Sequence, residues 1–297
     1  SAEYRDVVKI GRTHLQDAVP LTLGQEISGW SAMLGHDRDM IVQACRALSE
    51  LALGGTAVGT GLNAPAAFGD LAAEEISELL GYAFLSAPNK FHALTSKDQM
   101  VFAHGALKAL AADLMKIAND VRWLASGPRC GIGELIIPAN EPGSSIMPGK
   151  VNPVIPEVMN QIAFKVIGNE LCVTMADEAA QMELNAMEPV MAQCCFESAE
   201  LLVNGFDTLR IRCVEGITAN EERCLQYVHN SIGVVTALNP IIGYKNSTKI
   251  AKEALETGRG VYELVLEHGI LSREELDEVL KPENMIRPVK LNIRPRR

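Results

Sequence analysis

An eleven-residue segment carries the densest group of side chains able to bind an anion. Residues 143–153 read GSSIMPGKVNP and combine two hydroxyls, one lysine and one amide with two glycines and two prolines. Glycine and proline disfavour a regular helix or strand, so we expect a loop. Glycine lets backbone N–H groups approach an anion closely, while the Ser, Lys and Asn side chains supply further donors. Each residue alone suits a simple connector, but the combination predicts a functional site for carboxylate or phosphate oxygens.

Long helices are expected to position this loop. Pro156, which suits the first turn of a helix, opens an apolar segment whose hydrophobic residues keep a helical period to Val173. Residues 107–124 carry an uninterrupted heptad seam that ends before Gly127-Pro128, and residues 27–51 show a similar pattern. Such seams are typical of helices in a bundle, and they predict an all-α fold.

A second polar block lies near the start of the chain. Residues 9–26 read KIGRTHLQDAVPLTLGQE, and we expect a loop that leads into a helix. A lone histidine in such a place is more often a hydrogen-bonded structural residue than a catalytic one, so local evidence leaves the role of His14 open. Because the chain has a net charge of −10, an anion would need local cations, which draws attention to Arg12 and Lys150.

Composition excludes several classes of protein. The 297 residues are 47% hydrophobic and 22% charged, which is typical of a globular protein with a sizeable core. The acidic balance argues against nucleic acid or an anionic membrane as the main partner. Seven cysteines without a CxxC pair favour reduced thiols in the cytoplasm over a disulfide framework or a zinc site. No apolar run reaches the length of a membrane span, and no signal peptide is visible.

The domain organisation is predicted from a break near Gly216. Residues 1–215 are expected to form a central helical-bundle domain that carries the loop, and residues 216–297 a small helical C-terminal domain. Ser272 and Glu275 have the spacing of a capping box, which predicts a helix start. The basic, proline-containing tail from Ile286 is expected to be a solvated end.

Several blocks together resemble the fumarase/aspartase superfamily. GSSIMPGKVNP resembles its signature loop, and the block at 9–26 is similar to a second family block. GGTAVGTGLN (54–63), GITAN (216–220) and ALNPIIGY (237–244) resemble further blocks, in the family's order over essentially the whole chain. The family's N-terminal domain, which supplies part of the substrate site, has no counterpart here. We therefore expect a fragment, a proteolysed product or one piece of a split polypeptide.

Two segments decide the expected reaction within the family. PEVMNQIAFKVIGNE (156–170) and LNAMEPV (184–190) resemble the aspartase versions, and fumarases usually carry a lysine where Glu188 stands. The expected function is therefore that of an aspartate ammonia-lyase, a carbon–nitrogen lyase that converts L-aspartate to fumarate and ammonia by anti-elimination. The alternatives are a class II fumarase, or a helical scaffold of this family that has lost catalysis.

The resemblance also implies roles for individual residues. Ser144 corresponds to the family's base, and Glu157 to the carboxylate partner of His14, so these three are the expected catalytic residues. A small dicarboxylate substrate would be bound by four further residues: Thr13, Ser145, Lys150 and Asn152. The family pattern requires neither a metal ion nor an organic cofactor. It implies a homotetramer whose long helices form a central bundle and whose active sites are shared between subunits.

Overall fold

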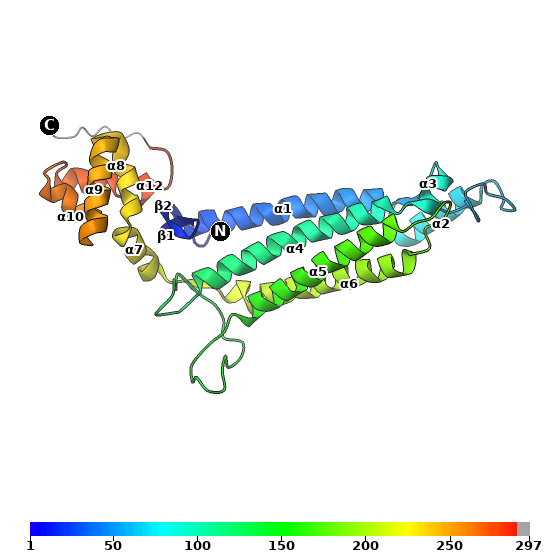
Figure 1. Cartoon of the computed structure of the whole chain (residues 1–297), viewed down its shortest axis with the longest axis horizontal. Coiled ribbons are helices and arrows are strands. Elements are labelled where there is room, and N and C mark those ends of the chain that lie inside the picture. Colours follow the sequence, from blue (N-terminus) through cyan, green and yellow to red (C-terminus); the bar gives the residue numbers. More distant parts are fainter. Residues whose placement is uncertain (290–297) are drawn as a thin grey trace. The chain divides into compact units, whose positions relative to one another are not determined.

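The computed structural model describes residues 1–289, and the chain separates into two compact units. Unit 1 comprises residues Ser1–Ser31, Leu124–Ile136 and the segment from Ile217 onward; unit 2 comprises Ala32–Trp123 and Ile137–Gly216. Figure 1 shows both, and each is described by itself below. Residues 290–297 of the basic tail lie outside the described part of the chain.

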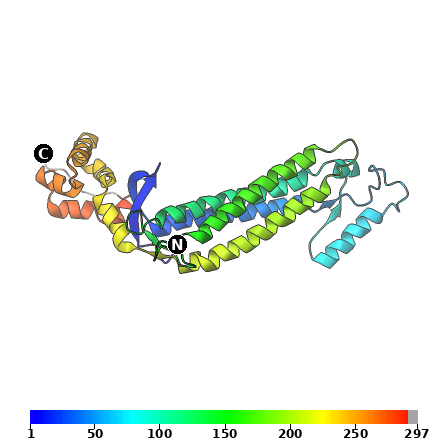
Figure 2. The same cartoon turned by 60° about the horizontal axis from the view of Figure 1, so that its bottom comes forward.

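The long helices run alongside one another as a bundle, in agreement between Figures 1 and 2. They are α1 (Leu23–Ala47, whose first turns belong to unit 1), α4 (Asp98–Leu124), α5 (Val154–Glu178) and α6 (Glu188–Arg212). This confirms the predicted all-α, long-helix architecture. The short 3-10 helix η1 (Val214–Gly216) follows α6.

Apolar side chains and a few polar links hold the helices of unit 2 together. The predicted seam of α4 is buried at Leu114, Ile117 and Val121, so the heptad pattern correctly identified the packed face. The buried His104 on α4 lies with its Nε2 2.9 Å from the Oγ of Ser198 on α6. Burial lowers the pKa of His104, because the charged imidazolium loses solvation there.

Short elements complete unit 2. They are α2 (Phe68–Leu80), α3 (Lys90–Thr95) and the parallel pair of β3 (Glu50–Leu51) with β4 (Leu85–Ser86).

Unit 1 begins with a hairpin where the sequence predicted only a loop. Strand β1 (Val8–Thr13) pairs antiparallel with β2 (Gln16–Thr22), and α1 follows directly. The predicted helix is confirmed as α1. The loop predicted before it is wrong, because these residues form a hairpin of two strands. Its tight turn contains no glycine or Asn-Gly pair, and β2 contains a proline, so the usual hairpin signals are absent from the sequence.

Short helices make up the rest of unit 1. They are α7 (Glu221–Asn230), η2 (Ile232–Val234), α8 (Val235–Ile242), α9 (Tyr244–Thr257), α10 (Val261–Glu267), α11 (Arg273–Val279) and α12 (Pro282–Met285). One core joins them, built around residues such as Leu238, Leu264 and Leu276, with Ile10 of β1 included. The predicted capping box is confirmed, since Ser272 and Glu275 exchange both bonds at the start of α11.

A small antiparallel pair links two distant segments of unit 1, β5 (Leu135–Ile136) and β6 (Thr218–Ala219). Unit 1 thus gathers Ser1–Ser31 and Leu124–Ile136 with the C-terminal helices. The predicted domains, 1–215 and 216–297, follow the order of the chain instead, and they stay a prediction. Within residues 1–289, no helix combines the length and the apolar character that crossing a membrane requires.

Candidate functional site

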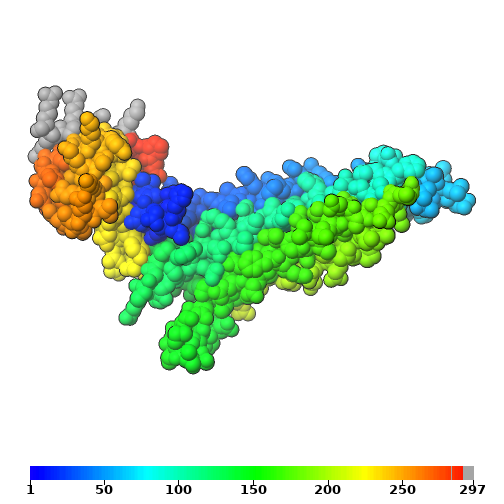
Figure 3. Space-filling view, viewed as in Figure 1, coloured from blue at the N-terminus to red at the C-terminus, as the bar shows by residue number. Residues whose placement is uncertain are grey.

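Residues 143–153 form an exposed loop that leads into α5, standing out in green in Figure 3. The backbone N–H of Gly143 donates to the carbonyl oxygen of Lys150 over 2.9 Å, and the side-chain amide of Asn152 donates to the carbonyl oxygen of Gly143 over 2.7 Å. A Cβ on Gly143 would lie 2.5 Å from the oxygen of Lys150, and Gly149 has a φ of +81°. Both glycines are therefore needed for this closed shape.

The hydroxyl of Ser144 accepts two backbone hydrogen bonds within the loop. The N–H groups of Ile146 and Met147 donate to its Oγ, over 3.3 Å and 3.1 Å. Two N–H donors aimed at one oxygen favour negative charge on that oxygen. A negative charge on the Ser144 oxygen would thus be stabilised within the loop.

A lysine with no ionic partner lies on the same loop. Lys150 is exposed, and within residues 1–289 its ammonium group forms no ion pair. Ser145 is exposed beside Ser144, and only one of the two N–H groups of the Asn152 amide is taken up by Gly143. The loop therefore presents a cation and several donors that remain available to an anion.

Glu157 lies in the first turn of α5, within a polar cluster of unit 2. The Arg122 guanidinium donates to its Oε1 over 3.4 Å and to the Oδ1 of Asn119 over 3.1 Å. Asn160 also donates to Asn119, over 2.8 Å. Glu157 is thus oriented by an arginine that the sequence analysis did not single out.

Thr13 and His14 lie on unit 1, at the end of β1 and in the hairpin turn. Both are exposed, and His14 and Leu15 have φ values of 54° and 60°. The structure therefore divides the predicted residues between two units. Unit 1 holds Thr13 and His14. Unit 2 holds the other five, which lie on one loop and in the first turn of α5: Ser144, Ser145, Lys150, Asn152 and Glu157.

Arg12, the other cation that the sequence indicated for an anion, is instead paired with a carboxylate of the protein. Both ends of its guanidinium bind the carboxylate of Glu134, which is completely buried. Lys9 is buried with this pair. A charged residue inside an apolar stretch, as in VVKIG and GIGELII, is the sequence signal that could have revealed the cluster.

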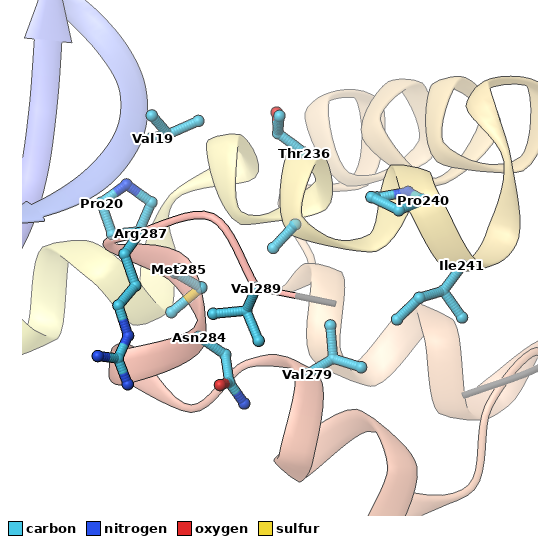
Figure 4. Close-up of a pocket in the computed structure, with 11 residues that line it drawn as sticks. Val19, Pro20, Thr236, Pro240, Ile241, Val279, Asn284, Met285, Arg287 and Val289 are labelled. Atoms are coloured by element: carbon cyan, nitrogen blue, oxygen red, sulfur yellow. The ribbon is translucent and has the colours of Figure 1, made fainter. Parts of the chain in front are cut away.

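A separate pocket in unit 1, of about 280 Å³, contains none of the predicted site residues. Figure 4 shows its mostly apolar walls, with Thr236, Asn284 and Arg287 as the polar members. Among residues 1–289, no three His, Cys, Asp or Glu side chains are grouped to hold a metal ion.

The helical bundle and the serine- and lysine-bearing loop define the class of lyases. The lyase family model matches residues 1–168, more than half of the chain, and the model described as the fumarase C C-terminus matches residues 234–287. The chain therefore belongs to the fumarase/aspartase superfamily of lyases.

Class II fumarases are prominent among its relatives. The chain is 55% identical over 285 residues to fumarate hydratase class II of Bacillus subtilis, covering 96% of this chain and 62% of that protein. The corresponding protein of Helicobacter pylori (strain J99) is 54% identical, over 97% and 62% of the two chains. The crystal structure of a class II fumarase from Schistosoma mansoni superposes with a TM-score of 0.93 at 38% identity, over 96% and 62%. The chain thus spans 62% of the length of these relatives.

The expected aspartate ammonia-lyase function is wrong. Relatives at 51–55% identity over 96% or more of this chain are named class II fumarate hydratase, which acts on a carbon–oxygen rather than a carbon–nitrogen bond. The segments that suggested aspartase are structural: residues 156–170 lie in α5, with Met159 and Val166 in the bundle core, and Glu188 pairs with Lys97 at 2.7 Å.

Proposed function

We propose that this chain is the part of a class II fumarate hydratase that carries the catalytic loop. The protein would catalyse the reversible addition of water to fumarate, which gives malate. The observation that carries the proposal is the hydroxyl of Ser144, which accepts two loop N–H groups on the same loop as the unpaired Lys150. The names and identities of the relatives support the choice of fumarate and malate.

The chemistry explains why these residues are needed. In the dehydration of malate to fumarate, a proton leaves a carbon next to a carboxylate that is already charged, and the hydroxyl group leaves the neighbouring carbon as water after taking up a proton. The intermediate is a dianionic aci-carboxylate. Fixed donors and cations in a site that excludes water can stabilise such a charge by roughly 3 kcal/mol for each well-placed group.

Each residue of the loop then has a task. Ser144, as an alkoxide, takes the proton from carbon, and the N–H groups of Ile146 and Met147 stabilise its charge. Lys150 and Asn152 bind a carboxylate of the substrate, and Ser145 donates to the other. A loop with an exposed Ile146, hinged on Gly143 and Gly149, is suited to closing over substrate.

Thr13 and His14 would contact the substrate from a different part of the assembly. Glu157 would orient the His14 imidazole, while Arg122 keeps the carboxylate of Glu157 in place. We propose that these groups meet in a homotetramer that shares its sites between subunits.

Two apolar stripes on the bundle support this assembly. On α5, Phe164, Leu171 and Met175 are exposed at helical spacing, and on α6 Phe196, Val203 and Phe206 are exposed in the same way. A row of exposed aromatic and aliphatic residues of this kind marks an interaction surface. The seven free cysteines suit a reducing compartment, which supports the cytoplasm as the location.

The ultraviolet absorbance of fumarate tests the proposal. The complete protein is expected to consume fumarate without ammonia, and to produce fumarate from malate. Formation of fumarate from aspartate, with none from malate, would overturn it.

A further inference from the structure

A buried cluster of charges lies against strand β1, directly before Thr13 and His14. Arg12 donates from both terminal nitrogens to Glu134, over 3.0 Å each, and Glu134 has no exposed surface. The Lys9 ammonium lies 3.3 Å from Glu134 and 3.1 Å from Glu26, and it donates to the carbonyl oxygen of Ile10. Two cations and two carboxylates thus balance, and the paired bonds of Arg12 fix its orientation.

Helix α7 holds the other side of this cluster in place. The backbone N–H of Asn220 donates to the carbonyl oxygen of Glu134 over 2.8 Å, and the hydroxyl of Tyr227 donates to the carbonyl oxygen of Ile132 over 3.0 Å. The ring of Tyr227 also lies under the Arg12 guanidinium, 5.3 Å from its carbon to the ring centroid. Arg12 is therefore fixed by the segment that carries Glu134, and this segment is itself held by Asn220 and Tyr227.

The turn beyond Arg12 needs such an anchor. Thr13 pairs with Gln16, so His14 and Leu15 alone make the turn, and both have left-handed φ values. Glycine or asparagine usually occupies these positions, because other side chains are strained there. Leu15 is largely exposed, so packing contributes little to hold it. A strained backbone of this kind persists only where its surroundings fix it.

We infer that Arg12 and Glu134 are positioning residues for the Thr13–His14 turn. Their ion pair keeps β1 paired with β2 up to its last residue and thereby fixes the direction in which the His14 imidazole points. The inference rests on the proposed function in one respect, namely that Thr13 and His14 contact the substrate. Arg12 then acts on the turn through its paired bonds to Glu134 and not as a ligand of the substrate.

The substitution Arg12→Lys tests this inference in the complete protein. It keeps the positive charge but loses the paired bonds, whereas removing Glu134 would leave buried cations unbalanced and endanger folding. We expect kcat/KM to fall by at least about tenfold, as expected for a displaced catalytic group. The control Arg5→Lys, on an exposed arginine that pairs with the neighbouring Asp6, should leave kcat/KM unchanged.

A second substitution separates positioning from general stability. Leu15→Gly relieves the strain at one of the two left-handed positions of the turn, so adding it to Arg12→Lys should restore part of the lost activity. If the double variant is no more active than Arg12→Lys, or if Arg12→Lys is as active as the parent, the inference is wrong.

Hydrogen exchange gives a readout that does not depend on activity. Amides of the peptide that spans residues 10–18 should exchange faster in Arg12→Lys than in the parent, and more slowly again in the double variant. Unchanged exchange in Arg12→Lys would overturn the inference even if activity fell. An inactive parent protein would instead count against the proposed function, while the exchange pattern would still decide the role of Arg12.

Discussion

The side-chain amide of Asn152 donates a hydrogen bond of 2.7 Å to the carbonyl oxygen of Gly143, so the two ends of the candidate catalytic loop are tied together. The same glycine donates its own N–H to the carbonyl oxygen of Lys150. Lys150, which is proposed to bind the substrate, is therefore held in position through its backbone by Gly143. Gly143 directly precedes the proposed base, Ser144. A substitution at either end of the loop should therefore change the positions of both Ser144 and Lys150.

The two glycines of the loop should respond differently to alanine. In Gly143→Ala the new Cβ would clash with the backbone oxygen of Lys150, whereas in Gly149→Ala it meets nothing within 4 Å and costs only the left-handed φ, about 1–2 kcal/mol. We expect kcat/KM to fall about 10²-fold in Gly143→Ala and much less in Gly149→Ala. Steady-state kinetics of both variants checks this, and equal losses would contradict the described loop geometry.

Ser144→Ala should abolish the proton transfer without harming the assembly. Loss of a general base typically lowers kcat by about 10²–10⁴-fold, while an exposed loop residue contributes little to folding. Ser28→Ala, on an exposed helical serine whose hydroxyl donates to the carbonyl oxygen of Gln25, is the matched control. Turnover and molecular mass in solution are the measurements. A Ser144→Ala variant as active as the control would exclude Ser144 as the base and favour the view that the chain is a scaffold.

The apolar stripe of α6 offers a paired test of the homotetramer. Val203 and Asn204 are adjacent and both exposed, but only Val203 continues the stripe. A charge buried at an interface without a partner is strongly unfavourable. Val203→Asp should therefore shift the mass measured by light scattering towards smaller species, whereas Asn204→Asp should not. If both variants keep the mass of the parent, α6 does not form the subunit interface.

Asp37 should make stability depend on pH. Burial raises its pKa to about 6, and the nearby carboxylate of Asp113 contributes to this shift. Because the folded state binds this proton more tightly than the unfolded state, the stabilisation is complete below about pH 4 and is lost as the pH rises towards about 6. Asp37→Asn removes the penalty of the charge.

Urea unfolding across this pH range measures the effect. Near neutral pH, Asp37→Asn should be more stable than the parent, by at most about 3 kcal/mol, and the difference should vanish near about pH 4. A variant that is less stable than the parent throughout the range would show that the folded state stabilises the Asp37 carboxyl group and does not penalise its charge.

The parts of the fold that depend on local patterns could be predicted from the sequence. The seam of α4, the proline in the first turn of α5 and the capping box of α11 are all signals spanning a few helical turns at most. The β1–β2 hairpin could not be predicted because its turn consists of His14 and Leu15, without the glycine or Asn-Gly pair that usually marks such a turn.

The candidate site was only partly predictable for the same reason. The loop could be predicted from its composition, since Ser144 and Lys150 lie in one eleven-residue segment with glycines and prolines. Arg122 beside Glu157 and the pair of Arg12 with Glu134 join residues far apart in the chain, which no local pattern reveals. The expected aspartase function was wrong because it relied on two short segments, in α5 and around Glu188, whereas relatives similar over 96% of the chain are named fumarate hydratase.

The central claim, that this chain carries the loop of a fumarate hydratase, is tested most directly by following fumarate in D2O with proton NMR. The complete protein should convert fumarate to malate that carries a single deuterium at the carbon next to the hydroxyl-bearing one, in the position expected for anti addition. No incorporation, or formation of aspartate only when ammonia is added, would contradict the claim.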